Sequence, residues 1–105
     1  MLDALQAQFE DSSASYADTN GIERDADWFL LKLFEEVGEL TQVWNRLSGR
    51  GRRHGRSEEE LRRALADETA DLLGHILLFA RRNEIDLPAA IERKWHFRPG
   101  GSGAD

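Results

Sequence analysis

The sequence predicts an all-α domain built from four helices. Only two prolines occur in 105 residues, and residues that favour helices (Ala, Leu, Glu and Arg) dominate the segments between short glycine-containing breaks. Apolar residues in these segments recur at helical spacing and do not alternate as they do in strands. We therefore expect a single all-α domain over residues 1–98 and a disordered C-terminal tail over residues 99–105.

The first two predicted helices have recognisable ends. The first covers about residues 2–16, and the sequence Asp-Thr-Asn-Gly at 18–21 then supplies stop signals. The second begins after a cap at Asp25 and continues to about residue 47, where Ser-Gly-Arg-Gly follows. Both boundaries come from local chemistry alone.

The last two predicted helices also begin at capping residues. Ser57 and Glu60 have the spacing of a capping box, from which the third helix continues through residue 82, with Asn83 as a left-handed cap. The fourth covers about residues 87–97, with Asp86 as its cap and Pro88 in its first turn, where a missing N–H does no harm.

Composition excludes several classes of partner and site. The net charge of −6 disfavours nucleic acid as the main partner, because neutralisation of phosphates drives such binding. The chain has no cysteine, so it forms neither disulfides nor thiolate metal sites. No secretory signal begins the sequence, and no apolar run approaches the roughly 20 residues that span a bilayer. We expect a cytoplasmic protein that does not enter membranes.

Two acids of the third predicted helix fall inside its apolar stripe. On a helical wheel of about 100° per residue, Asp71 and His75 lie about 60° and 20° to one side of Glu68. A surface helix places its acids opposite the stripe, so this pattern indicates a functional site. The apolar residues on the other side are Leu61, Leu65, Leu72 and Phe79.

The second predicted helix carries acids along the edge of its apolar arc. Glu36 and Glu39 lie at that edge, and Glu35 lies further toward the polar side. The same acids also fit a solvated charged face, in which Lys32 pairs with Glu36 one turn away. Gly38 costs the helix roughly 1 kcal/mol relative to alanine, which predicts a close helix contact. The arc comprises Leu30, Leu33, Val37, Leu40, Trp44 and Leu47.

Two helices that each carry an acid pair at i,i+3 can turn these pairs toward each other. Four gathered carboxylates would repel one another and lose hydration, unless some were protonated or a cation lay between them. With oxygen ligands only, Mg²⁺ or Mn²⁺ is the natural occupant. His75 either hydrogen-bonds Asp71 or is an ordinary core histidine.

The apolar surface of the third predicted helix also indicates self-association. Residues 69–80 are apolar on nearly every face, and a helix of that kind must be buried nearly all round. One copy of a small chain cannot easily surround it. We therefore expect at least a dimer, with residues 71–80 buried, Leu77 in the subunit contact and the contacts bordering the acids.

Two motifs resemble those of a known enzyme family. Residues 32–40, Lys-Leu-Phe-Glu-Glu-Val-Gly-Glu-Leu, resemble the K-L-x-E-E-x-G-E-L signature of MazG-like nucleotide pyrophosphohydrolases. Glu68-Thr-Ala-Asp71 resembles the family's E-x-x-D partner motif, and residues 85–95 resemble its closing helix. The 28 residues between Glu39 and Glu68 form a gap at the long end of the family's range. The similarity covers about residues 26–98.

The resemblance implies an enzyme that hydrolyses nucleoside triphosphates to monophosphate and pyrophosphate, as in housecleaning of the nucleotide pool. It implies Mg²⁺, with Mn²⁺ as a substitute, and a homodimer or homotetramer of four-helix subunits. The implied metal ligands are Glu36, Glu39, Glu68 and Asp71, and Glu35 is the residue that orients water or a further metal. The implied phosphate-binding residues are Lys32, Lys94 and Arg98.

Two other functions fit the same residues. The histidine four residues after Asp71 resembles that of phosphoribosyl-ATP pyrophosphohydrolase, an enzyme of histidine biosynthesis in the same superfamily. A non-catalytic helical binding or oligomerisation module is the second alternative, and its mark would be the loss of an acid, whereas none is lost.

The remaining motifs have more than one interpretation. The loop 49–56, with four arginines, fits a solvated loop or a clamp that folds over the triphosphate. Trp28, Trp44 and Trp95 are candidates for base stacking and equally for the core or an interface.

Overall fold

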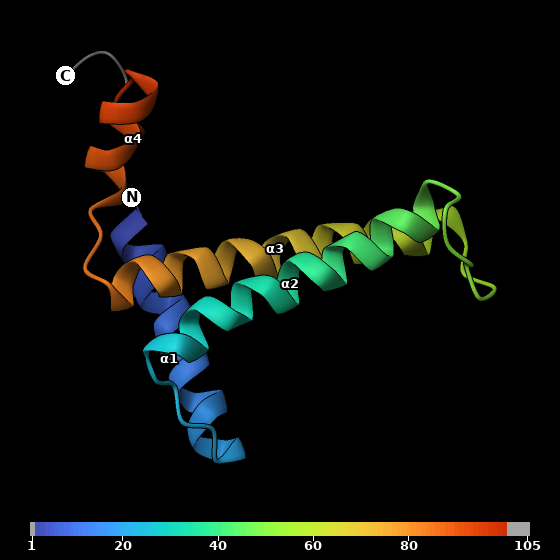
Figure 1. Ribbon diagram of the computed structural model, residues 1–105, viewed down its shortest axis with the longest axis horizontal. Helices are drawn as coiled ribbons and strands as arrows, with labels where there is room; N and C mark the ends of the chain where they lie inside the picture. Colours follow the sequence, from blue (N-terminus) through green and yellow to red (C-terminus); the bar gives the residue numbers. More distant parts are fainter. Residues whose placement is uncertain (1, 101–105) are drawn as a thin grey trace. The chain divides into compact units, whose positions relative to one another are not determined.

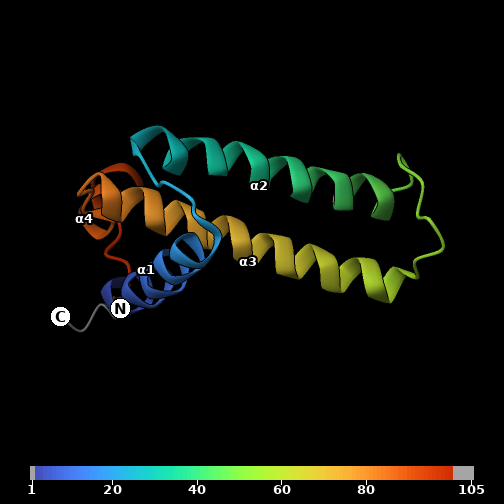
Figure 2. The same cartoon turned by 90° about the horizontal axis from the view of Figure 1, so that it is seen from below.

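The computed structural model describes residues 2–100, which form four helices (Figures 1 and 2). No strand occurs among these residues, so the all-α prediction is confirmed. No helix in the described range is both long and apolar enough to cross a membrane. Of the predicted tail, Pro99 and Gly100 form a turn, and residues 101–105 lie outside the described residues. The helices are α1 (Leu2–Asn20), α2 (Ala26–Leu47), α3 (Glu58–Arg82) and α4 (Leu87–Trp95).

The chain packs as two compact units. The first combines α1, the end of α3 from Leu77 onward, and α4. The second is Glu23–Ile76, which contains α2, the arginine-rich loop and the rest of α3. All the predicted acidic site residues belong to the second unit.

The predicted helix starts are confirmed by hydrogen bonds. The backbone N–H of Trp28 donates to the Asp25 carboxylate at 2.8 Å, which caps α2. The Ser57 N–H donates to Glu60 Oε1 at 2.9 Å, and the Glu60 N–H donates to Ser57 Oγ at 3.1 Å. This reciprocal pair is the expected capping box of α3. Asp86 caps α4 as predicted.

The predicted helix ends are less accurate. α1 continues to residue 20 and ends at Gly21, which has a left-handed φ of 64°. The left-handed residue after α3 is Glu84, with φ 54°, so the prediction of Asn83 at that position is wrong. The Asn83 side chain instead donates to the Phe79 carbonyl at 2.9 Å and satisfies a carbonyl at the helix end. α4 ends at residue 95, two residues before the predicted end.

In the first unit, α1 packs on the end of α3. Gln6 Nε2 donates to the Leu77 carbonyl at 3.3 Å. The Leu77 side chain is only 2% exposed within a single chain, so a lysine there would unfold the chain and would not report on a subunit contact. The prediction that this leucine tests assembly is therefore wrong. Leu73 and Ile76, in contrast, remain 45% and 40% exposed.

In the second unit, α2 and α3 run side by side in opposite directions (Figures 1 and 2). Phe29, Glu36 and Val43, spaced seven residues apart on α2, are buried, and so is Leu61 on α3. Glu36 thus lies in the middle of the buried line of α2, so the edge of the predicted apolar arc, and not its centre, faces α3. The apolar arc of α2 is wider than the part of the α2 surface that α3 covers. Its outer members remain exposed, namely Leu30, Val37 and Trp44, together with neighbouring Phe34.

Candidate metal centre

Three acidic side chains meet between α2 and α3. Glu36 and Glu39 come from successive turns of α2 and Glu68 comes from α3, and one carboxylate oxygen of each lies within 4.8 Å of the others. Oxygen ligands lie about 2.0–2.6 Å from Mg²⁺ or Ca²⁺, so one hard cation can contact all three. The structure therefore brings together three of the four predicted ligands at the spacing that a metal ion needs.

Asp71, the fourth predicted ligand, lies at the margin of this cluster. It is not within the ligand spacing shared by the other three among the described residues. Its negative charge nevertheless raises the pKa of both Glu36 and Glu68, so it belongs to the same electrostatic environment. Its side chain is exposed, which leaves it open to a ligand from solvent.

Burial makes Glu36 a weak acid. Its side chain is 5% exposed, and loss of hydration is the main cause that raises its pKa from 4.5 to about 7. The charge of Glu39, a hydrogen bond with Glu39 and the charge of Asp71 raise it further, whereas the charge of Lys32 opposes the shift. Near neutral pH the buried carboxyl therefore exchanges a proton readily, and a bound cation would favour its ionised form.

Glu68 has an oxygen that the described residues do not satisfy. Its Oε2 atom is buried and accepts no hydrogen bond within residues 2–100. Burial raises the pKa of Glu68, and the charges of Glu39 and Asp71 act in the same direction. An unpartnered buried carboxylate oxygen is costly, and a cation beside it would remove that cost. The donor set thus fits a divalent metal ion.

A lysine lies at the edge of the cluster. Lys32 Nζ forms an ion pair with Glu35 Oε1 at 3.2 Å and lies 5.9 Å from the ring centroid of Trp28. Its side chain is 25% exposed, and its charge lowers the pKa of Glu36. The ring and the ion pair hold the ammonium group beside the acids, while Glu35 is exposed outside the ligand group.

His75 lies next to Trp28, with the ring centroids 6.0 Å apart in an edge-on arrangement. Its Nδ1 atom is buried and makes no hydrogen bond in the described part of the chain, so it does not bond to Asp71. Burial lowers the pKa of His75, the charge of Lys32 lowers it further, and nearby carboxylates oppose this. The imidazole is therefore neutral at pH 7.

The other predicted cations belong to other segments of the chain. Lys94 on α4 is exposed, and Arg98 pairs with Glu92 at 3.7 Å; both belong to the first unit, and their contact with phosphate stays a prediction. In the loop, Arg53 donates to the Leu47 carbonyl at 3.1 Å and so holds the end of α2. The loop 49–56 begins 13 residues after Glu36, roughly 20 Å along the helix direction. As a clamp it would have to fold back over the hairpin.

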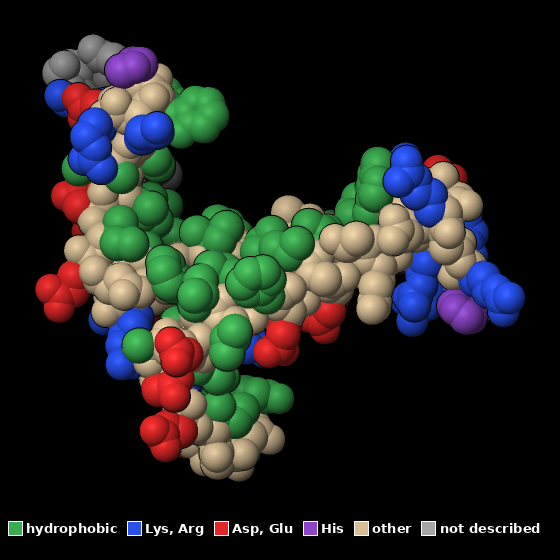
Figure 3. Space-filling model, in the orientation of Figure 1, with side chains coloured by type: hydrophobic (Ala, Val, Ile, Leu, Met, Phe, Trp, Pro, Cys, Tyr) green, Lys and Arg blue, Asp and Glu red, His purple; other side chains and the backbone are tan. Residues whose placement is uncertain are grey.

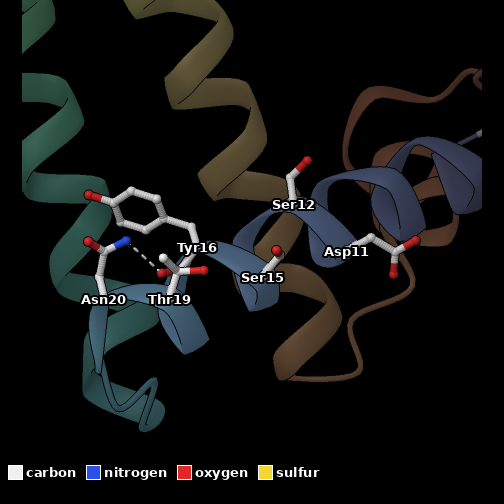
Figure 4. Close-up of a pocket in the computed structure, with 6 residues that line it drawn as sticks. All are labelled: Asp11, Ser12, Ser15, Tyr16, Thr19 and Asn20. Carbon is white, nitrogen blue, oxygen red and sulfur yellow. Dashed lines mark hydrogen bonds between the residues drawn. The ribbon is translucent and has the colours of Figure 1, made fainter.

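A hollow lies along α1 in the first unit (Figure 4). The sequence did not predict a site at its polar side chains. Asn20 Nδ2 donates to the Tyr16 carbonyl at 2.8 Å within it. The hollow contains one acid, Asp11, and the group of possible metal ligands among the described residues lies in the second unit. Its lining is Asp11, Ser12, Ser15, Tyr16, Thr19 and Asn20.

Comparisons with protein-family models, curated proteins and solved structures found no match for this chain. The functional assignment therefore depends on the residues of the second unit and on their geometry.

Metal binding should stabilise the protein through Glu68. We expect Mg²⁺ or Mn²⁺ to raise the melting temperature, because an ion that binds only the folded state adds about 2.7 kcal/mol at 100 times its Kd. Glu68→Gln should abolish this gain, whereas Glu59→Gln, at an exposed position of the same helix, should keep it. Calorimetry with and without metal measures both. An unchanged metal response in a folded Glu68→Gln variant would remove Glu68 from the ligand set.

Glu36 should make the metal-free protein less stable as pH rises. Its pKa in the folded protein, about 7, exceeds the ordinary value of 4.5, so the native state binds more protons between these values. The contribution of Glu36 to the free energy of unfolding is then fully present below pH 4.5. It is lost, by roughly 3 kcal/mol in all, as the pH rises through 7. Glu36→Gln should remove that loss, as measured by urea denaturation at pH 5 and pH 8 with a chelator. Equal pH slopes in both proteins would contradict the assignment.

Proposed function

We propose that this chain is a magnesium-dependent nucleotide pyrophosphohydrolase of the MazG-like type. It would convert nucleoside triphosphates to monophosphate and pyrophosphate as a homodimer or homotetramer. The observation that carries the proposal is the cluster of Glu36, Glu39 and Glu68, in which one buried oxygen lacks a partner. The cluster coincides with the two acid motifs that resemble those of the family.

The acids would serve a metal that works on phosphate. Bound Mg²⁺ offsets negative charge on phosphate oxygens and lowers the pKa of water. Glu36, Glu39 and Glu68 would hold this ion, and exposed Asp71 would join them when the metal and substrate are bound. Glu35 lies outside the ligand group with its carboxylate in solvent, where it can orient the attacking water or accept its proton.

Lys32 is the cation best supported for contact with the substrate. The triphosphate carries about four negative charges, and divalent ions held by acids leave much of this charge uncompensated. Lys32 is already held beside the cluster by Glu35 and Trp28. Lys94 and Arg98 are the further phosphate-binding residues of the proposal, by resemblance.

His75 favours one alternative substrate. Its neutral ring, with a buried and unpartnered Nδ1, offers a hydrogen-bonding group one turn beyond Asp71. A histidine in this position is the feature shared with phosphoribosyl-ATP pyrophosphohydrolase. That substrate therefore belongs in the same assay as the nucleoside triphosphates.

A screen for pyrophosphate release tests the function directly. Canonical and modified nucleoside triphosphates and phosphoribosyl-ATP are incubated with the protein and Mg²⁺. We expect turnover of at least one nucleoside triphosphate, lost on addition of chelator and reduced at least 100-fold in Glu39→Gln, because Glu39 is a ligand but is exposed enough to be replaced without unfolding. Turnover of phosphoribosyl-ATP alone would select the histidine-pathway reaction. No turnover of any substrate by metal-loaded protein would favour a non-catalytic module.

Lys94→Ala should raise KM for the triphosphate at least tenfold, about 1.4 kcal/mol, and leave the stabilisation by Mg²⁺ in place. The lysine contacts phosphate in the proposal and does not contact the metal. Arg93→Ala is the matched control on the same exposed helix, with KM near that of the native protein. Steady-state kinetics on both variants decides the matter. A normal KM for Lys94→Ala would assign phosphate binding to Lys32 and the loop.

A further inference from the structure

One face of α2 is apolar and exposed. Leu30, Phe34, Val37 and Trp44 are 45%, 72%, 47% and 53% exposed. With Thr41 they follow the alternating four-and-three spacing of a coiled-coil seam. The Thr41 hydroxyl donates to the Val37 carbonyl at 2.7 Å, so this residue presents its methyl group. Figure 3 shows hydrophobic side chains gathered along one edge of the α2–α3 hairpin. A contiguous exposed stripe of this kind marks an interaction site.

Gly38 borders this seam without an evident role inside the chain. Its backbone is helical, so no left-handed conformation requires glycine. A Cβ built there would meet nothing within 4 Å in the described structure. A glycine in the interior of a helix is unfavourable unless a neighbour needs the space. Gly38 therefore leaves open space beside the seam for a neighbour from outside the described residues.

A groove opens between α2 and α3 beside the seam, with a volume of about 340 Å³. Thr69 Oγ1 donates to the Leu65 carbonyl at 2.7 Å, so its hydroxyl, like that of Thr41, is satisfied within its own helix. The groove is thus lined by apolar groups. The lining residues are Leu40, Thr41, Trp44, Leu65 and Thr69.

The protruding side chain that fits this groove is also on α2. Phe34 is the most exposed residue of the seam, but it lies seven residues, roughly 10 Å, from Thr41 on the same helix. It cannot enter the groove of its own chain. In an antiparallel pair of α2 helices centred on Val37, position 34 of one copy lies opposite position 40 of the other, which is in the groove.

Charge selects the antiparallel orientation. At the start of α2 the acids Glu23, Asp25 and Asp27 outnumber the single base Arg24, whereas Arg50 and Arg52 lie just after its end. Antiparallel pairing places the acidic end of each copy beside the basic end of the other. Parallel pairing would place like charges together, which is unfavourable.

We propose that α2 pairs antiparallel with α2 of a second copy about a twofold axis near Val37, with Phe34 of each copy in the groove of the other. Such a contact is self-complementary and closed. Glu39 lies about 160° around α2 from Val37, so this exposed acid of the cluster faces away from the proposed contact. The proposal therefore does not depend on the activity and can fail or succeed separately from it.

Phe34→Asp tests the surface by light scattering and sedimentation of the full chain. The native protein should be dimeric or a multiple of a dimer at micromolar concentration, and Phe34→Asp should raise the dissociation constant at least 100-fold while the helical spectrum is kept, because the side chain is 72% exposed. Leu31→Asp, on α2 but off the seam and 56% exposed, is the matched control and should associate normally. A monomeric native protein, or equal association of both variants, overturns the proposal.

Single cysteines test the orientation, since the chain has none of its own. Val37→Cys, near the axis, should be joined to its counterpart by a short thiol crosslinker in high yield. Leu30→Cys should not, because two copies of position 30 would lie roughly 21 Å apart. Equal crosslinking at both positions indicates parallel helices and overturns the antiparallel arrangement. Absence of crosslinking at position 37 in an associated protein overturns the proposed axis.

Discussion

The second unit depends on how it accommodates carboxylates buried between two helices. Glu36 occupies the middle of the buried line of α2, where an apolar residue would stabilise the packing, and Glu68 meets it from α3. Burial raises the pKa of both, and the charges of Glu39 and Asp71 raise both further. Burial of Phe29, Val43 and Leu61 along the same two helices must offset this cost. A cation between the carboxylates would convert the least favourable place in the hairpin into a favourable one.

The ends of the two helices in this hairpin are held by local hydrogen bonds. Asp25 caps α2, and Ser57 and Glu60 close the capping box of α3. Arg53 holds the carbonyl of Leu47 where α2 ends. Each contributes on the order of 1 kcal/mol. Together these contacts fix the helix ends, so that the acids face each other even while they repel.

The sequence predicted what depends on neighbouring residues and missed what depends on distant ones. Helix starts follow from a capping side chain three residues away, and these predictions were confirmed at Asp25, Ser57 and Asp86. The choice of Glu84 over Asn83 for the left-handed position depends on how the chain leaves α3, and neither residue's intrinsic preference determines it.

The same distinction holds at the site. Spacing on each helix placed Glu36, Glu39 and Glu68 in one candidate cluster, because an i,i+3 pair needs only helical geometry. Their depth could not be predicted, since the apolar arc of α2 is wider than one helix covers and either half could have faced α3. The structure turns Phe29, Glu36 and Val43 inward. That choice buries one acid and leaves the other half of the arc exposed.

The two consequences of that choice are physically linked. Turning Glu36 toward α3 buries a carboxylate where a cation would fit, and it turns the line from Leu30 to Trp44 outward, toward solvent. A helix with an apolar arc of this width cannot bury both lines against a single neighbour. The buried acids and the exposed apolar line are therefore two consequences of one orientation of α2. The orientation of α2 thus places the candidate metal centre and the exposed apolar line on different sides of one helix.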